Sequence, residues 1–269
     1  MKTLRLPLPS LFFQLVLVLV IVLSSLAIAV PKALAISTLD NFPTPNIDKT
    51  EKILGPAGEI FEFSTCNADG IGFTIAEAQI PPGAGPLPHI HHYTNEWFWT
   101  PQGGLQLFQS VKEYPDLDNP ATDEQAGNAT VYTVNTEPNQ IVYGPKYRVH
   151  GFANTTTETR PLTFIWLEDP ISPAYELHDG GIREYFQDVG IPIKDLKHLP
   201  AITDQSKIEF VSHAPLYGIN QSYYFFEYVD GVNGKLPTPL VSLNNDKSLN
   251  RIIETINAYN QGDTSVHCF

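Results

Sequence analysis

Short apolar runs alternate with polar positions and turn residues along residues 53–167. Runs of this length, repeated about every ten residues, are typical of a β-sandwich or a β-barrel. Prolines and glycines at 81–83 and 144–145 break the pattern between neighbouring runs. We therefore predict an all-β domain over residues 53–170. Its strands are expected at 59–64, 72–80, 96–100, 105–111, 130–134, 141–143 and 162–167.

A different pattern follows in residues 171–269, which we expect to form a C-terminal extension that packs on the barrel. Apolar residues at helical spacing predict a short helix over 181–189 that ends at Gly190. A second, amphipathic helix is predicted over 247–259. Its apolar stripe consists of Leu249, Ile252, Ile253, Ile256 and Tyr259. The segments 210–211 and 223–229 are expected to be strands.

The first 35 residues have the pattern of a secretory signal peptide. Lys2 and Arg5 precede an apolar run over 15–30, and a small-x-small cleavage site ends at Ala35. The apolar run is also long enough to be retained as a membrane anchor, which is the alternative. We expect a secreted or periplasmic protein in which residues 36–52 form an N-terminal linker.

The charge of the mature chain excludes two classes of partner. Lys2, Arg5 and Lys32 leave with the signal, so 13 basic residues face 29 acidic ones, a net charge of about −16. A chain this acidic repels nucleic acid and anionic lipid, which leaves a small molecule as the expected partner. The two cysteines, Cys66 and Cys268, either pair, as exported proteins allow, or stay free thiols. Sequence alone leaves both options open because bridging depends on distance.

Three histidines and one glutamate are the candidate metal ligands. Alternate side chains of a strand share a face, so His89 and His91 point the same way and His92 points the other way. A jelly-roll barrel brings the ends of separate strands around one interior, so Glu96 and His150 can approach that pair. Imidazole nitrogen and carboxylate oxygen suit one divalent transition ion, namely Mn, Fe, Co, Ni, Cu or Zn, with coordination positions left open.

Strand parity also predicts the surroundings of this site. If Glu96 points inward, Phe98 does too, while Trp97 and Trp99 face outward. Either the C-terminal extension or a second copy of the chain in a homodimer then covers the two tryptophans. Three aromatic residues are the expected apolar wall of a substrate pocket, namely Phe98, Tyr143 and Phe152.

These residues fall in two blocks that resemble the signature of the cupin superfamily. The blocks are Gly83, His89, His91, Glu96 and Gly103, followed by Pro145, His150 and Asn154. The resemblance covers about residues 53–170. It implies a single double-stranded β-helix, the cupin jelly-roll barrel, whose two histidines, glutamate and later histidine bind Mn, Fe, Ni, Cu or Zn.

Two details refine the resemblance. The second block usually has a glycine where this chain has Tyr147, so we expect that turn to be built differently. Asn154 is expected to be a turn or hydrogen-bonding residue and not a fifth ligand. A single domain with Pro-Pro-Gly before its histidines and a helix after the barrel is most similar to the quercetinase-like group of small cupins.

Function follows less directly, because one scaffold hosts many activities. The leading hypothesis is a metal-dependent oxidoreductase, a dioxygenase that acts on a small oxygenated organic molecule. The ion would lower the pKa of the substrate, and Glu96 would act as general base, by analogy with that group. A second hypothesis is a non-redox lyase, isomerase or decarboxylase. A third, a non-enzymatic binding or storage-like cupin, ranks last because the chain keeps the full ligand set.

Overall fold

The computed structural model describes residues 37–48, 51–118, 131–168, 181–221, 238–239 and 246–269. The signal-like segment and the strand expected over 223–229 lie outside these residues. Among the helices that are described, none is both long enough and apolar enough to span a bilayer.

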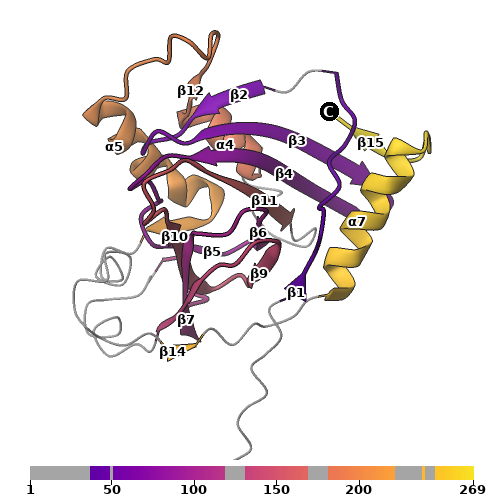
Figure 1. Ribbon diagram of the computed structural model, residues 1–269, viewed down its shortest axis with the longest axis horizontal. Helices are drawn as coiled ribbons and strands as arrows, with labels where there is room; N and C mark the ends of the chain where they lie inside the picture. Colours follow the sequence, from indigo (N-terminus) through magenta and orange to yellow (C-terminus); the bar gives the residue numbers. More distant parts are fainter. Residues whose placement is uncertain (1–36, 49–50, 119–130, 169–180, 222–237, 240–245) are drawn as a thin grey trace, which may run out of the picture. The chain divides into compact units, whose positions relative to one another are not determined.

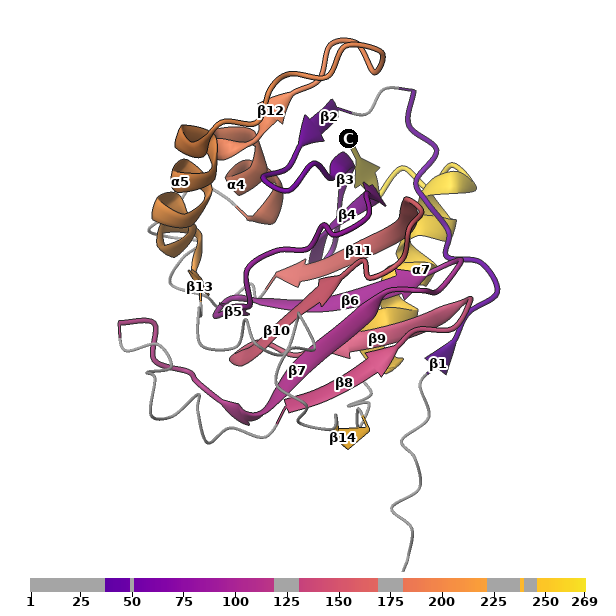
Figure 2. The ribbon, with the colours of Figure 1, turned by 60° about the vertical axis from the view of Figure 1, so that its left-hand side comes forward.

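Fifteen strands within the described residues form two sheets, antiparallel except for one pairing of β14 with β8 (Figures 1 and 2). The larger sheet runs β1-β9-β6-β11-β4-β3-β2-β12, with β15 beside β3, and the smaller runs β13-β5-β10-β7-β8-β14. The larger sheet consists of β1 Ser37–Thr38, β2 Glu51–Leu54, β3 Ile60–Ala68, β4 Ile71–Ile80, β6 Thr94–Thr100, β9 Gln140–Gly144, β11 Arg160–Glu168, β12 Ile191–Pro192 and β15 His267–Cys268. The smaller consists of β5 His89–His91, β7 Gln106–Glu113, β8 Val131–Asn135, β10 Arg148–Ala153, β13 Ile219–Gln221 and β14 Thr238–Pro239. This is the predicted jelly-roll barrel, followed by the predicted extension with helices.

The larger sheet is buried on both faces, and this explains the apolar residues at successive positions of its central strands. On β6, Phe98 belongs to the core of the barrel, whereas Trp97 and Trp99 belong to a second core on the outer face. The helix α7, Asp246–Asn260, contributes Leu249, Ile252 and Ile256 to that second core and runs along this face (Figure 1). The inward and outward directions on β6 are therefore as predicted, and the C-terminal extension of the same chain covers the tryptophans.

Two more helices lie beside the barrel core. The helix α4, Ile182–Val189, ends at Gly190, whose N–H donates to the Phe186 carbonyl, as the sequence predicted. The helix α5, Asp204–His213, is followed by the 3₁₀ turn η1, Ala214–Tyr217. The strand expected at 210–211 is wrong, because these residues lie within α5. Thr203 starts that helix by accepting a hydrogen bond from the Ser206 N–H, and two apolar residues alone carry no periodicity.

The segment 36–52 is more than a linker. Ser37–Thr38 pairs with β9, the side chain of Phe42 is buried in the outer core, and β2 already begins at Glu51. The sequence predicted only a linker, but an extended segment can also dock at the edge of a sheet. At the other end of the chain, Cys268 on β15 forms a disulfide with Cys66 on β3, so the pairing option is the correct one.

Candidate metal centre

The four predicted ligands converge from three strands. His89 and His91 lie on β5, Glu96 on β6 and His150 on β10. One ligand atom from each lies within 4.8 Å of all the others. The Oε2 atom of Glu96 is 2.9 Å from Nε2 of His150 and 3.4 Å from Nε2 of His91. The cluster joins the two sheets, because β5 and β10 are neighbours in one sheet and β6 belongs to the other.

The Nδ1 atom of each imidazole has an oxygen partner outside the cluster. A ring that donates its Nδ1–H to such an oxygen keeps the lone pair of Nε2 free for a metal, and this contact also fixes the orientation of the ring. The Nδ1 atoms of His89, His150 and His91 lie 2.9 Å from the Leu87 carbonyl, 2.9 Å from the Arg148 carbonyl and 3.3 Å from the Thr94 hydroxyl. The backbone and Thr94 therefore hold the three rings with Nε2 available to an ion.

Two atoms of the cluster test whether a metal fits there. Glu96 and His150 are each only 1% exposed. Although Oε2 of Glu96 and Nε2 of His150 lie 2.9 Å apart, neither has a hydrogen-bond partner of acceptable geometry among the described residues. A buried carboxylate oxygen without a partner is costly, and a cation placed between these atoms would satisfy both. The residues therefore fit a metal ion.

Protonation states in the cluster agree with this reading. Burial raises the pKa of Glu96, but its close contacts with His150 and His91 lower it more, to about 2. Burial, with smaller contributions from the neighbouring imidazoles, lowers the pKa of His89 to about 3 and also lowers that of His91. At neutral pH the carboxylate is thus ionised and these two imidazoles are neutral, the forms that coordinate metals.

A cavity of about 300 Å³ opens onto the cluster, with His89, His91 and Glu96 in its lining. A volume of this size suits a small ligand. The walls are largely aromatic and come from strands of both sheets and from α4 and α5. The aromatic lining residues are Phe61, Phe152, Phe164, Trp166, Tyr185, Phe186 and Phe210, and the polar ones include Glu59, Lys207 and Gln221.

Of the three predicted wall residues, only Phe152 lines the cavity. Phe98 points inward but is buried behind the cluster, with its ring 5.9 Å from that of His150. The prediction for Tyr143 is wrong. It lies directly across from Trp97 and shares the outer face with it, with the two rings 4.9 Å apart, and its hydroxyl donates to Asn95 Oδ1.

Most residues of the cavity wall were not predicted from the sequence, because their position in the wall depends on which strands and helices pack together. The apolar stripe of α4 was visible in the sequence but was expected only to pack on the barrel. Instead, Tyr185 and Phe186 of that stripe belong both to the core and to the cavity lining. The hydroxyl of Tyr185 donates to the Phe210 carbonyl, which ties α4 to α5 at the cavity.

The turn of the second block also differs from expectation. Tyr147 has φ +72°, the left-handed conformation that glycine adopts readily and other residues rarely do. The turn is therefore not built differently; the tyrosine takes the glycine conformation. Its N–H donates to the His91 carbonyl at 2.8 Å, and its carbonyl accepts from the Tyr114 N–H at 2.6 Å. These bonds connect the second block directly to a ligand of the first.

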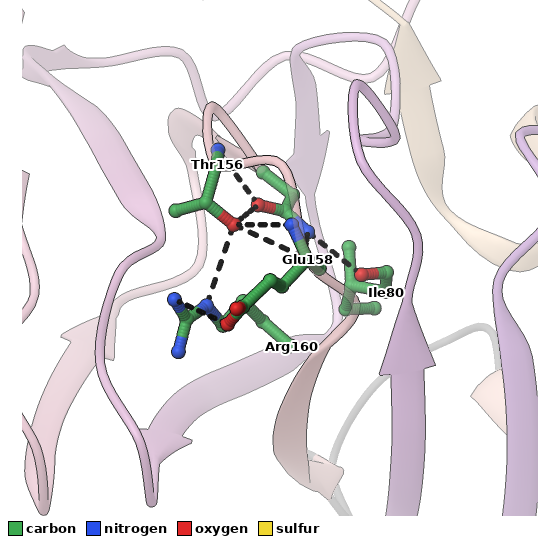
Figure 3. Close-up of polar contacts among 5 residues, drawn as sticks. Ile80, Thr156, Glu158 and Arg160 are labelled. Atoms are coloured by element: carbon green, nitrogen blue, oxygen red, sulfur yellow. Dashed lines mark hydrogen bonds and ion pairs between the residues drawn. The ribbon is translucent and has the colours of Figure 1, made fainter.

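Asn154 is a turn residue, as expected. Its amide nitrogen donates to the carbonyls of Ile80 and Glu158, and its amide oxygen accepts from the backbone N–H and hydroxyl of Thr156. Figure 3 shows Thr156, Glu158 and Arg160 gathered around this network, with Ile80 on the neighbouring strand. The asparagine thus ties the end of β10 to β4, away from the metal ligands.

No family model matches the sequence, and no curated protein matches it. Similar solved structures include the Schizosaccharomyces pombe Cnp3 cupin domain, 13% identical over 43% of this chain and 66% of that one, with a TM-score of 0.30. A cupin-superfamily sugar phosphate isomerase from Silicibacter pomeroyi is 14% identical over 48% and 77%, with a TM-score of 0.30. Staphylococcus aureus CapF, a capsular polysaccharide assembling protein, is 17% identical over 49% and 29%, with a TM-score of 0.28.

The chain thus spans less than two thirds of the Cnp3 domain and of CapF. TM-scores this low carry no argument about activity. The two signature blocks, the two sheets that bring them together and the cluster of three histidines and one glutamate agree with the jelly-roll barrel that the resemblance to the cupin superfamily implies. Its four-residue cluster could hold one metal ion.

Proposed function

We propose that this protein is an exported, metal-dependent oxidoreductase of the dioxygenase type that acts on a small oxygenated organic molecule. The observation that carries the proposal is the cluster of His89, His91, Glu96 and His150, which opens into a mainly apolar and aromatic cavity. Four protein ligands leave coordination positions of a five- or six-coordinate ion for a ligand from the cavity.

The chain's own residues would hold and shield the reactants. When bound, the ion would supply Lewis acidity and, for a redox-active metal, electron transfer. Phe152, Phe164 and Trp166 would orient an unsaturated ring and exclude water from it. Glu96 is a weak base while its pKa stays at about 2, so a role as general base requires its carboxylate to leave the two imidazoles that lower this pKa.

The cavity lining favours this proposal over chemistry on sugar phosphates. Phosphate groups are usually held by several cationic or N–H donors. Among the described residues that line the cavity, Lys207 is the only lysine or arginine, whereas seven are phenylalanine, tyrosine or tryptophan and several are aliphatic. The second candidate is a non-redox metal enzyme that acts on an aromatic acid. Such an enzyme should stay active with zinc, whereas a dioxygenase should not.

Export is supported by two features of the chain. The signal-like pattern of the first 35 residues predicts secretion or transfer to the periplasm. The disulfide between Cys66 and Cys268 is a bond that persists in oxidising compartments. The acidic charge supports a small-molecule partner and speaks against nucleic acid and anionic membrane surfaces.

Metal analysis followed by oxygen uptake tests the proposal. Protein purified from its native compartment is analysed for metals, stripped, and reloaded separately with Mn, Fe, Ni, Cu or Zn. We expect one equivalent of metal and oxygen consumption with phenolic compounds for at least one redox-active ion but not for zinc. Equal turnover with zinc would support the non-redox candidate, and a protein that takes up no metal would contradict both.

A further inference from the structure

Three of the four cluster residues have a cross-strand neighbour with an unsatisfied polar atom. Residues directly opposite each other in an antiparallel pair share a face, with Cβ atoms about 5 Å apart. Trp166 lies opposite Glu96, Gln221 opposite His89 and Gln109 opposite His150. Within the described residues, Nε1 of Trp166, Oε1 of Gln221 and Nε2 of Gln109 are buried and have no hydrogen-bond partner. Three residues next to the cluster therefore each carry a buried polar atom without a partner.

Such atoms need an explanation, because native proteins leave few buried polar atoms without a partner. The indole of Trp166 is only 3% exposed, so solvent does not compensate for the missing bond. Trp166 and Gln221 both line the cavity together with His89 and Glu96, whereas Gln109 does not. The first two can therefore be satisfied by a molecule that occupies the cavity.

The shape of the cavity wall adds a second constraint on that molecule. The rings of Phe164 and Trp166 are nearly parallel, at 6° and 5.0 Å between centroids, and both belong to the larger sheet. Phe152 and Ile219, from the smaller sheet, also line the cavity. A flat, apolar ligand suits aromatic walls of this kind.

We propose that Trp166 and Gln221 are specificity-determining residues that hydrogen-bond the substrate, with Trp166 Nε1–H as donor and Gln221 Oε1 as acceptor. This assignment rests on the proposed function and adds a substrate class to it. The substrate class is a planar aromatic compound that carries an oxygen acceptor next to the oxygen bound at the metal centre, and a hydroxyl donor further along the ring. Trp166 serves the acceptor because it neighbours Glu96, and Gln221 serves the donor from the other sheet.

Single substitutions separate the two contacts from simple packing. Trp166→Phe keeps a flat ring and removes the N–H, and Gln221→Met keeps the length of the side chain and removes the amide. Trp99→Phe is the matched control, because it removes an indole N–H that donates to the Leu39 carbonyl on the outer side of the larger sheet. Thermal unfolding of each variant shows that it folds before binding is measured.

Calorimetric titration of the zinc-loaded proteins measures binding without redox turnover. The probes are phenol, catechol and 1,2,4-trihydroxybenzene. The preference for one probe over another is the ratio of their binding constants. We expect Trp166→Phe to lower the ratio for catechol over phenol about tenfold, because chelation of the ion by catechol is the same in the variant and the wild type. Gln221→Met should lower the preference for 1,2,4-trihydroxybenzene over catechol by a similar factor, and Trp99→Phe should change neither ratio.

The possible outcomes distinguish this assignment from the proposed function. Bound zinc with both ratios unchanged in Trp166→Phe and Gln221→Met overturns the assignment alone, because the unpaired atoms would then be satisfied by water. Failure of the wild-type protein to bind zinc contradicts the proposed function and this assignment with it. A drop in the ratios that Trp99→Phe reproduces also overturns the assignment, since it would reflect general loosening of the barrel.

Discussion

His91 and His92 are consecutive in the chain, but only His91 reaches the metal cluster. Its Nε2 atom lies 3.4 Å from Glu96 Oε2, whereas the ring of His92 contacts the Pro115 carbonyl and Asn220. Both imidazoles are buried, at 2% and 3% exposure, so burial does not separate their roles. The end of the strand does, because β5 ends at His91 and His92 begins the bend that follows, and the two histidines provide a matched pair of positions for mutagenesis.

His91→Ala should remove most of the bound metal, because it deletes one of four ligands. Loss of a ligand should weaken binding by more than the roughly 10–100-fold that loss of a ligand's hydrogen-bond partner costs. Elemental analysis and competition with a chelator measure this directly. His92→Ala, which removes a buried imidazole from the adjacent position, should still bind one equivalent. Full occupancy in His91→Ala would show that the cluster does not bind the ion.

Thr94 is expected to act on the metal through His91. Its hydroxyl lies 3.3 Å from Nδ1 of that histidine and is buried. Thr94→Val keeps the shape of the side chain and should weaken metal binding about 10–100-fold. Thr100→Val is the control on the same strand, because the Thr100 hydroxyl donates to the carbonyls of Glu137 and Gln140 instead. Equal metal affinities in the two variants would exclude the role of Thr94.

Glu59 should make the protein less stable as the pH rises. This cavity residue is 2% exposed, and burial raises the pKa of its carboxyl above the ordinary 4.5, although N–H groups, including that of Ala57, partly oppose this. The folded state then binds the proton more tightly than the unfolded state, so the free energy of unfolding falls as the pH rises from about 4.5 through the folded pKa.

Glu59→Gln resembles the protonated form and should lack this loss of stability. In urea unfolding between pH 4 and 7, the free energy of unfolding of the variant should therefore rise relative to that of the wild type as the pH increases. A difference between the two proteins that stays constant over this range, or that reverses, would mean that burial does not govern this carboxyl.

The conformation of Tyr147 predicts an order of stability for two variants. Tyr147→Ala and Tyr147→Gly both remove the ring, which lies 6.0 Å from that of His92 and beneath the Lys146 ammonium. Only glycine adopts φ +72° without steric cost. The glycine variant should thus be more stable than the alanine variant by about 1 kcal/mol in denaturant unfolding. An alanine variant of equal or greater stability would contradict the strain inferred at this position.

The ligands of the metal centre could be predicted because each depends on a local pattern. The spacing of His89 and His91 puts them on one face of a strand, and the two signature blocks supply Glu96 and His150. The helix stripes at 181–189 and 247–259 were equally local, and α4 and α7 match them. Strand parity failed at Tyr143, because the face of a five-residue strand depends on its register with the neighbouring β6.

The amino-acid sequence was enough to predict the all-β domain with its helical extension, the four residues able to bind a metal and the acidic charge. Periodicity, spacing and composition can be read from short stretches or from the whole chain without knowing the fold. Three relationships became visible only in the folded chain: Cys66 pairs with Cys268, α7 covers the outer tryptophans, and Trp166 and Gln221 flank the cluster. These relationships join residues up to 202 positions apart. They depend on strand register and packing between sheets, which no local pattern encodes.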